Sequence, residues 1–319
     1  MNTGTGLRGY AHPAYAAALA EFGRPRELTR SGGWILERSI PGTAARDAMG
    51  CYPLFACPNW SLLRDDLEAI GKDLVSLIVV TDPFGDYEKE TLSQAFTDLV
   101  VPFKEHFIVN LGGDLGGFVH SHHQRNAVKA LRQVTVEHVV HPLDFLDDWI
   151  RLYARLIERH GFTGVARFSE ESFAQQFAVP GLELFRAVHD GQSVGMTLWY
   201  TDGDHGYYHL AAYDETGYEL RASFALFWRA LEHFTASGLR QVGLGAGAGL
   251  DSDGSDGLTR FKRGWSNATR ATFLCGRIFD ETEYRRLSKV AGTTGVDYFP
   301  AYRKGEFSQA PGDERKTAS

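Results

Sequence analysis

Long apolar runs and cysteine are both scarce in this sequence of 319 residues. No apolar run approaches the ~20 residues that a membrane-spanning helix requires, and the first residues lack the apolar core of a signal peptide. The three cysteines, Cys51, Cys57 and Cys275, are odd in number and lack the spacing of a metal site. These absences predict a cytoplasmic protein without a membrane span, whose thiols are reduced and buried.

Basic residues are also in the minority, with 33 Lys and Arg against 40 Asp and Glu and a net charge of −7. This balance argues against a generalist nucleic-acid binder, so no DNA partner is expected. A local basic groove is still compatible with it, which leaves tRNA open as a partner. Apolar residues make up 43% of the chain, including 21 phenylalanines, which is enough for the packed cores of two domains.

Helices and strands are predicted to alternate along the first third of the chain, which indicates an α/β layer architecture. Residues 34–38, 74–80 and 107–111 have the composition of strands, whereas residues 88–96 and a segment ending at Ile70 have that of helices. Ser61 is the expected hydroxyl cap of the earlier helix. The glycine-rich residues 112–117 lack the Gly-Lys-Ser/Thr ending of a phosphate-binding loop, so they are interpreted as a flexible connection between domains.

Residues 120–123 are the densest histidine cluster of the chain. No carboxylate or cysteine stands at a suitable spacing, so we expect a helix start capped by Ser121 and no metal. Arg125, Lys129 and Arg132 then share one helix face. A solvated face is the simpler interpretation of this row, with contact to a phosphate-bearing substrate as the alternative.

Residues 194–265 have the clearest pattern of elements. Residues 194–200 and 207–213 are predicted strands joined by a turn rich in Asp and Gly. The helix that follows carries one apolar stripe and ends at Gly238, and residues 240–244 form the next strand. With a side-chain period of two, Tyr207, His209, Ala211 and Tyr213 should share one face of their strand, and Tyr208, Leu210 and Ala212 the other.

The order of these features resembles the GNAT acyltransferase superfamily, in the branch of the Fem-type peptidyltransferases. The resemblance spans roughly residues 118–303, and Lys262 is its most specific residue. It is carried by residues 125–130, 134–136, 207–212, 244–247, 261–262 and 299–303. It implies two GNAT-like domains, each a mixed central β-sheet flanked by helices. The expected domains are a degenerate N-terminal one over residues 1–117, an acyltransferase domain over 118–303 and a disordered tail over 304–319.

In the GNAT fold, two parallel strands separate at mid-sheet and hold the acyl donor between them; residues 207–213 and 240–245 would be these strands. The resemblance implies transfer of an acyl or aminoacyl group to a small-molecule or peptide amine, without a tightly bound cofactor. The donor is open between acyl-CoA and aminoacyl-tRNA. Of the loop that holds CoA pyrophosphate only Gly217 is present here, and the nearby acids Asp214, Glu215 and Glu219 repel phosphate.

The missing loop favours aminoacyl-tRNA as the donor, whereas the acidic balance favours a small donor, and two alternatives to the acyltransferase stay open. One is an aminoacyl-tRNA-dependent, Fem-like peptidyltransferase acting on a cell-wall precursor or a natural product. The other is a non-catalytic GNAT-like domain that binds a ligand in the same cleft.

The predicted site centres on Lys262, whose neighbours Phe261 and Trp265 should partly desolvate it. The resemblance assigns such a lysine to the donor ester or to the developing oxyanion, and a positioned cation there lowers the barrier to amine attack. The predicted catalytic residues are Lys262, Tyr208 and His209. The predicted donor-binding residues are Phe261, Trp265, Ala211, Ala212, Gly217 and Arg221, and the predicted substrate-binding residues are Tyr207, Arg125, Lys129 and Glu219.

Overall fold

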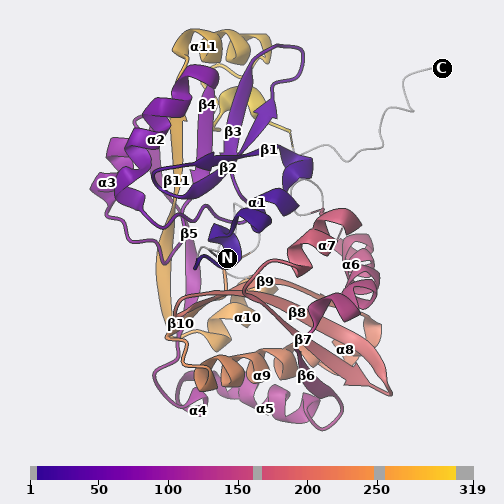
Figure 1. Ribbon diagram of the computed structural model, residues 1–319. Helices are drawn as coiled ribbons and strands as arrows, with labels where there is room; N and C mark the ends of the chain where they lie inside the picture. The colour runs from indigo at the N-terminus through magenta and orange to yellow at the C-terminus, as the bar shows by residue number, and fades with distance from the viewer. Residues whose placement is uncertain (1–5, 161–166, 248–255, 307–319) are drawn as a thin grey trace, which may run out of the picture.

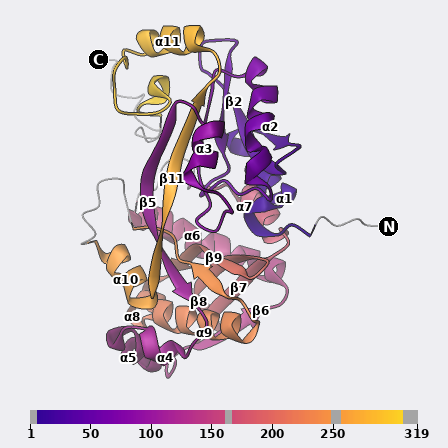
Figure 2. The same ribbon diagram turned by 90° about the vertical axis from the view of Figure 1, so that its left-hand side faces the viewer.

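Two long antiparallel strands, β5 (Leu99–Asn110) and β11 (Ala268–Ile278), run through the middle of the molecule and join its two halves (Figures 1 and 2). The computed structural model describes residues 6–160, 167–247 and 256–306. Its strands form one 11-stranded sheet in the order β1-β2-β3-β4-β11-β5-β10-β9-β8-β7-β6. The neighbours of this sheet are antiparallel except for the pairs β3 with β4 and β9 with β10, which are parallel.

The first half contains an antiparallel meander followed by a parallel strand. The meander consists of β1 (Arg24–Leu28), β2 (Gly33–Ser39) and β3 (Arg46–Gly50), and β4 (Ser76–Val80) lies beside β3. Helices α2 (Leu63–Ile70) and α3 (Lys89–Ala95) cover one face, where their buried leucines share a core with Leu77 and Val79. The remaining elements here are α1 (Pro13–Ala18), α11 (Glu281–Val290) and the 3-10 turns η1 (Gly9–Ala11), η2 (Ala20–Phe22), η3 (Trp60–Leu62), η4 (Gly71–Asp73) and η7 (Ala301–Arg303).

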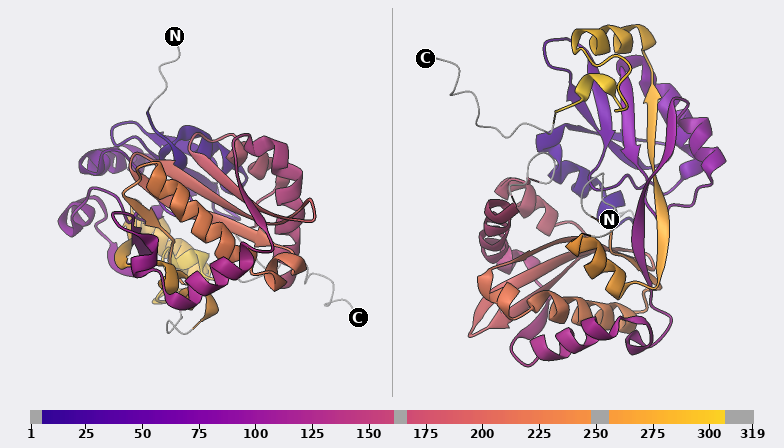
Figure 3. Two further views of the ribbon diagram at one scale, coloured as in Figure 1. Left: turned by 90° about the horizontal axis from the view of Figure 1, so that it is seen from below. Right: turned by 180° about the vertical axis from the view of Figure 1, so that it is seen from behind.

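The second half repeats this arrangement with one more strand. Its meander consists of β6 (Thr135–Val139), β7 (Leu182–His189), β8 (Gln192–Asp202) and β9 (His205–Tyr213), and β10 (Gln241–Gly243) is parallel to β9. Helices α5 (Ser121–Ala130) and α9 (Ala222–Ala236) lie side by side on one face (Figure 3). Helices α6 (Leu146–His160) and α7 (Glu170–Phe177) cover the other face. The short elements are α4 (Leu115–Phe118), η5 (Pro142–Phe145), α8 (Glu215–Glu219) and α10 (Gly257–Trp265).

The predicted fold class is confirmed, because each half is a mixed sheet flanked by helices. The halves nevertheless share one sheet, through an exchange of strands that the sequence does not predict. β5 follows β4 in the chain but pairs with β10, and β11 follows β10 but pairs with β4. Residues 268–303, assigned to the second domain from the sequence, therefore lie largely with the first half. The boundary at residue 117 stays a prediction.

Three local predictions differ from the structure. The Ser61 hydroxyl bonds Asn59 Oδ1 at 2.7 Å, and α2 begins without a side-chain cap. α5 is capped by the ring of His120, whose Nδ1 accepts from the backbone N–H of His122, so Ser121 is its first residue and not its cap. Residues 304–306 form a turn in which Glu306 pairs with Arg303, and the rest of the predicted tail lies outside the described residues. Within the described helices, none combines the length and apolarity needed to cross a membrane.

Candidate active site

Strands β9 and β10 separate at the predicted place. Their parallel pairing ends at Tyr207 and Gly243. Beyond it the chain follows β5, because Leu244 N–H donates to Phe107 O at 2.8 Å and Phe107 N–H donates to Gly245 O at 3.0 Å. β9 continues to Tyr213 beside β8, so its later residues have no strand partner on the β10 side within the described part of the chain.

A β-bulge interrupts β9 at this point. Trp199 of β8 pairs with Tyr208, but Leu198 pairs with Leu210, which leaves His209 as the extra residue. Bulges re-aim side chains and are common next to active sites. The predicted alternation is therefore wrong beyond the bulge, since His209, Leu210 and Ala212 all pack with the core under α6 and α7. Tyr208 and Tyr213 pack instead with the core under α9.

Lys262 belongs to α10, and its side chain lies beside the separation. The side chain of Asp256 caps this helix by accepting from Thr259 N–H at 2.9 Å. Lys262 is only 7% exposed. Its Nζ donates to Ala246 O at 2.7 Å and stands 5.6 Å from the centre of the Tyr208 ring. The ammonium is thus held between the two separated strands.

Gly245 leaves the space that the ammonium occupies. A Cβ at this position would lie 3.2 Å from Lys262 Nζ, and the residue has a φ of +75°, which favours glycine. Glycine at position 245 therefore serves two purposes: it adopts the positive φ, and it leaves room for the Lys262 ammonium.

The electrostatics of this cluster depend on burial. Burial and, to a smaller extent, nearby Lys104 lower the pKa of Lys262 to about 7, against an opposing effect of Asp256. His106, which belongs to β5 like Lys104, has its pKa lowered to about 4 by burial and by the two lysines, so its ring is neutral at pH 7. Lys104 and His106 are not among the predicted site residues, because the strand predicted from the sequence begins only at residue 107. Their i, i+2 spacing ahead of the apolar residues is the signal that was available.

His209 is not brought to Lys262. Its Nδ1 accepts from Tyr10 Oη–H at 3.0 Å and its Nε2–H donates to Gln176 Oε1 at 2.9 Å, on the face of the sheet opposite Tyr208. Burial lowers its pKa to about 3, so it is a neutral ring with both nitrogens satisfied. The structure gives it a place in a buried network of the core.

Tyr207 lies on the same face as His209 and reaches the first half of the molecule. Its hydroxyl donates to Asp82 Oδ2 at 2.9 Å, and the other carboxylate oxygen accepts from Phe84 N–H at 2.9 Å. Burial raises the pKa of Asp82 to about 6. From the sequence this aspartate is only part of a chain turn, since nothing local indicates that a tyrosine 125 residues later will meet it.

Several predicted donor-binding residues are packing residues. Trp265 and Ala212 are 0% exposed. A Cβ on Gly217 would lie 2.1 Å from Val194 O, so this glycine allows α8 to approach β8. Phe261 and Ala211 are half-buried, and Phe261 packs on Phe227 with ring centroids 4.9 Å apart. Of the predicted donor-binding residues near the strand separation, Phe261 and Ala211 are therefore the two that are still partly exposed to solvent.

The charged residues predicted to bind the donor or the substrate, unlike Lys262, lie on the surface. Arg221 precedes α9 in the left-handed region, with φ 58°, and its guanidinium donates to Asn126 Oδ1 of α5. Arg125 and Lys129 are exposed on that same helix, and Glu219 is exposed at the end of α8. Their roles toward a substrate stay predictions.

Residues 121–263 match the family described as "Acetyltransferase (GNAT) domain", from the first residue of α5 into α10. No curated protein shows significant similarity to the chain. Among solved structures, FemX is 12% identical with a TM-score of 0.63, and the match covers 86% of this chain and 92% of that one.

Two further structures share the fold over most of the chain. The C-terminal domain of a provisionally named lysylphosphatidylglycerol synthetase from Agrobacterium fabrum is 15% identical, with a TM-score of 0.60 and coverage of 90% and 95%. L-PGS from Bacillus licheniformis is 16% identical, with a TM-score of 0.55 and coverage of 85% and 93%. At these identities the likeness concerns the fold alone. The family match confirms the resemblance of this part of the chain to the GNAT superfamily.

Proposed function

We propose, from the match of residues 121–263 to an acetyltransferase (GNAT) domain, that the protein transfers an acyl group from an activated donor to an amine. The observation that carries the proposal is the position of Lys262, a buried ammonium held where β9 and β10 separate. Burying a lysine costs free energy because its ammonium loses water. Among the described residues, Lys262 has no carboxylate at hydrogen-bond distance to offset this cost, which is unusual for a lysine with a purely structural role.

The proposed reaction uses the free side of β9. The donor carbonyl lies in the gap, and the amine nitrogen attacks its carbon. As this bond forms, the carbonyl oxygen becomes an oxyanion, which the Lys262 ammonium stabilises. The carbon–sulfur or carbon–oxygen bond to the carrier then breaks, the leaving group takes up a proton, and the nitrogen releases one to solvent. Tyr208, whose ring lies beside the ammonium, is positioned to order the acyl group.

We favour a CoA thioester as the donor. α9 begins without a side-chain cap, so N–H groups of its first turn are available to a pyrophosphate. Two of the acids that the sequence places here have protein partners: Asp214 accepts from Gly217 N–H at 2.8 Å, and Glu215 pairs with Arg155 at 2.9 Å. Their repulsion of phosphate is thereby reduced, and Arg221 adds a positive charge at the helix start.

Titration of acetyl-CoA by calorimetry tests this choice. We expect saturable binding that Arg221→Glu weakens about tenfold, because a charge at the start of α9 is reversed. Arg229→Glu is the matched control, since Arg229 is exposed on the same helix, two turns further along, and should leave the affinity unchanged. Absence of binding at millimolar acetyl-CoA, together with binding of an aminoacylated tRNA acceptor stem, would make aminoacyl-tRNA the donor.

The pH dependence of turnover tests the role of Lys262 separately. Because its pKa in the folded protein is about 7, the cation is present below that pH and is lost above it. With an acceptor amine that is already neutral at pH 6, kcat should fall up to about tenfold per pH unit above pH 7. Release of free thiol from acetyl-CoA follows the rate. A kcat that rises through pH 7 would instead identify Lys262 as a general base.

A further inference from the structure

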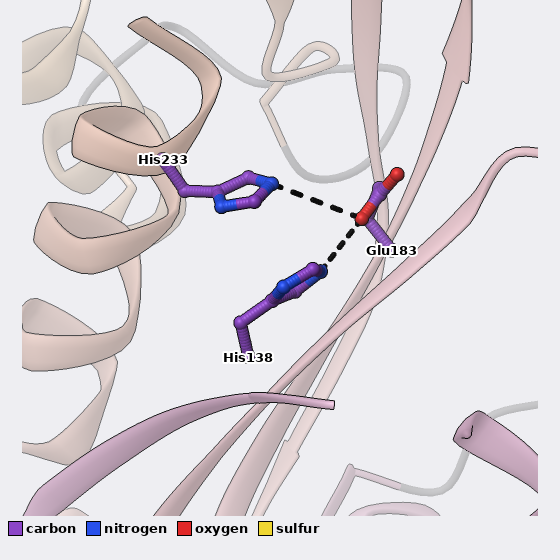
Figure 4. Close-up of side chains that lie close together, drawn as sticks. All are labelled: His138, Glu183 and His233. Atoms are coloured by element: carbon purple, nitrogen blue, oxygen red, sulfur yellow. Dashed lines mark hydrogen bonds and ion pairs between the residues drawn. The ribbon is translucent and has the colours of Figure 1, made fainter. Parts of the chain in front are cut away.

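A second cluster of functional side chains lies away from Lys262, at the outer edge of the second half. It consists of His138 on β6, Glu183 on β7 and His233 on α9 (Figure 4). Figure 4 shows both rings directed at the carboxylate from different elements. Among the described residues this is the one group of three or more such side chains whose ligand atoms lie close enough to hold a metal ion.

The geometry of the three ligand atoms is close to that of a metal site. Nε2 of His138 is 2.7 Å from Glu183 Oε2, Nε2 of His233 is 3.9 Å from the same oxygen, and all the ligand atoms lie within 4.8 Å of one another. Ligands bound at about 2.0–2.1 Å in a tetrahedral site are roughly 3.3 Å apart. Small side-chain rotations therefore suffice to equalise these distances.

The two imidazoles are held by a rigid support. Their ring centroids are 4.1 Å apart, and both rings pack on Phe185, at 5.0 Å for His138 and 5.4 Å for His233. Phe185 is 1% exposed, so this support belongs to the core.

We propose that His138, Glu183 and His233 bind a zinc ion, with water at the fourth position. Two imidazoles and one carboxylate form a ligand set that zinc accepts, and the side chains are about one-fifth to one-third exposed, which leaves a path for the ion and for water. Binding displaces the long hydrogen bond of 3.3 Å between His233 Nε2 and Ser237 Oγ. It needs no other described contact to break, apart from the His138–Glu183 bond that the ion replaces.

A zinc ion here would join α9 to the edge of the sheet. α9 has Arg221 at its start and His233 in its last turn, roughly 18 Å apart along the helix at 1.5 Å per residue. The site is therefore distinct from the proposed phosphate-binding start of α9 and does not depend on the proposed reaction. Its expected effect is on stability, because it fixes the C-terminal end of α9 against β6 and β7.

The test is titration of metal-free protein without an affinity tag. We expect calorimetry to give one equivalent of Zn²⁺ at saturation, and Co²⁺ to give the visible absorption of a tetrahedral site. His138→Ala and His233→Ala should each weaken binding on the order of 100-fold, and Glu183→Gln on the order of tenfold. Zinc should raise the melting temperature of the parent protein and leave that of His138→Ala unchanged.

The double variant His120→Ala/His122→Ala is the matched control, because it removes two exposed rings of the other histidine cluster. It should bind zinc as the parent does. Three results would each overturn the proposal: loss of binding in this control, undiminished binding in both histidine variants, or no binding by the parent protein at about 100 μM zinc. The last result means a binding free energy weaker than roughly 5.5 kcal/mol. Circular dichroism shows whether each variant is folded. If a histidine variant is unfolded, the zinc affinity of Glu183→Gln is the test of the proposal.

Discussion

Lys262→Met is expected to lower kcat for acyl transfer by a factor on the order of 10²–10³, the usual effect of removing one oxyanion donor. The methionine fills the volume of the lysine stem beside Tyr208 without its charge. The melting temperature should not fall, because the substitution removes the cost of holding an ammonium at 7% exposure. Thiol release from acetyl-CoA in the presence of a panel of primary amines gives kcat. The cysteines of the protein are buried, so their contribution to that assay is small.

Two further variants separate charge from position. Lys262→Arg should restore activity only in part, because a planar guanidinium does not fit the place of a compact ammonium beside Gly245. Arg260→Met, on the exposed side of the same helix, should leave kcat unchanged. Near-normal turnover in Lys262→Met would refute the oxyanion role and the mechanism built on it.

Asp47→Ala is expected to lower the free energy of unfolding by about 3–5 kcal/mol, as breaking a buried ion pair does. Asp47 is 0% exposed and accepts from Arg303 Nε at 2.6 Å, from Arg38 Nε at 3.2 Å and from Tyr302 Oη at 3.0 Å. Without it, two nearly buried guanidiniums lose their shared carboxylate. Scanning calorimetry should show a melting temperature lower by roughly 4–8 °C.

Asp73→Ala provides the comparison for this variant. Asp73 is half exposed and lies 3.4 Å from Arg26, so its removal should change stability by less than about 1 kcal/mol. Asp47→Asn should give an intermediate loss, since the amide retains an acceptor for one arginine. Equal effects of the two alanine variants would show that the Asp47 cluster does not hold residues 301–303 against β3.

Local patterns were sufficient to predict most of the elements of the second half. The apolar stripe of α9, the turn before β9 and Gly238 after α9 are all short-range signals, and the structure agrees with each. The place where β9 and β10 separate was also predicted, because the family resemblance implies which two strands are neighbours. The buried position of Lys262 agrees with its aromatic neighbours.

The differences arise where distant residues decide the outcome. The bulge at His209 depends on the register with β8, which no local pattern encodes, and it moved this histidine into the core with Tyr10 and Gln176. Asp82 and Tyr207 are brought together by the docking of the two halves. The metal ligands proposed above belong to three separate elements, so no sequence spacing indicates them.

The exchange of β5 and β11 has a consequence for how the protein folds and unfolds. β10 pairs with β5, which follows the first half in the chain, and β4 pairs with β11, which consists of residues 268–278. The sheet is incomplete in both halves until the chain has been synthesised past residue 278. A fragment cut at residue 117 therefore lacks β11, and its complement lacks β5. Loss of either half exposes a strand edge of the other. The two GNAT-like halves are therefore expected to melt as one cooperative unit, with a single transition where two independent domains would show two.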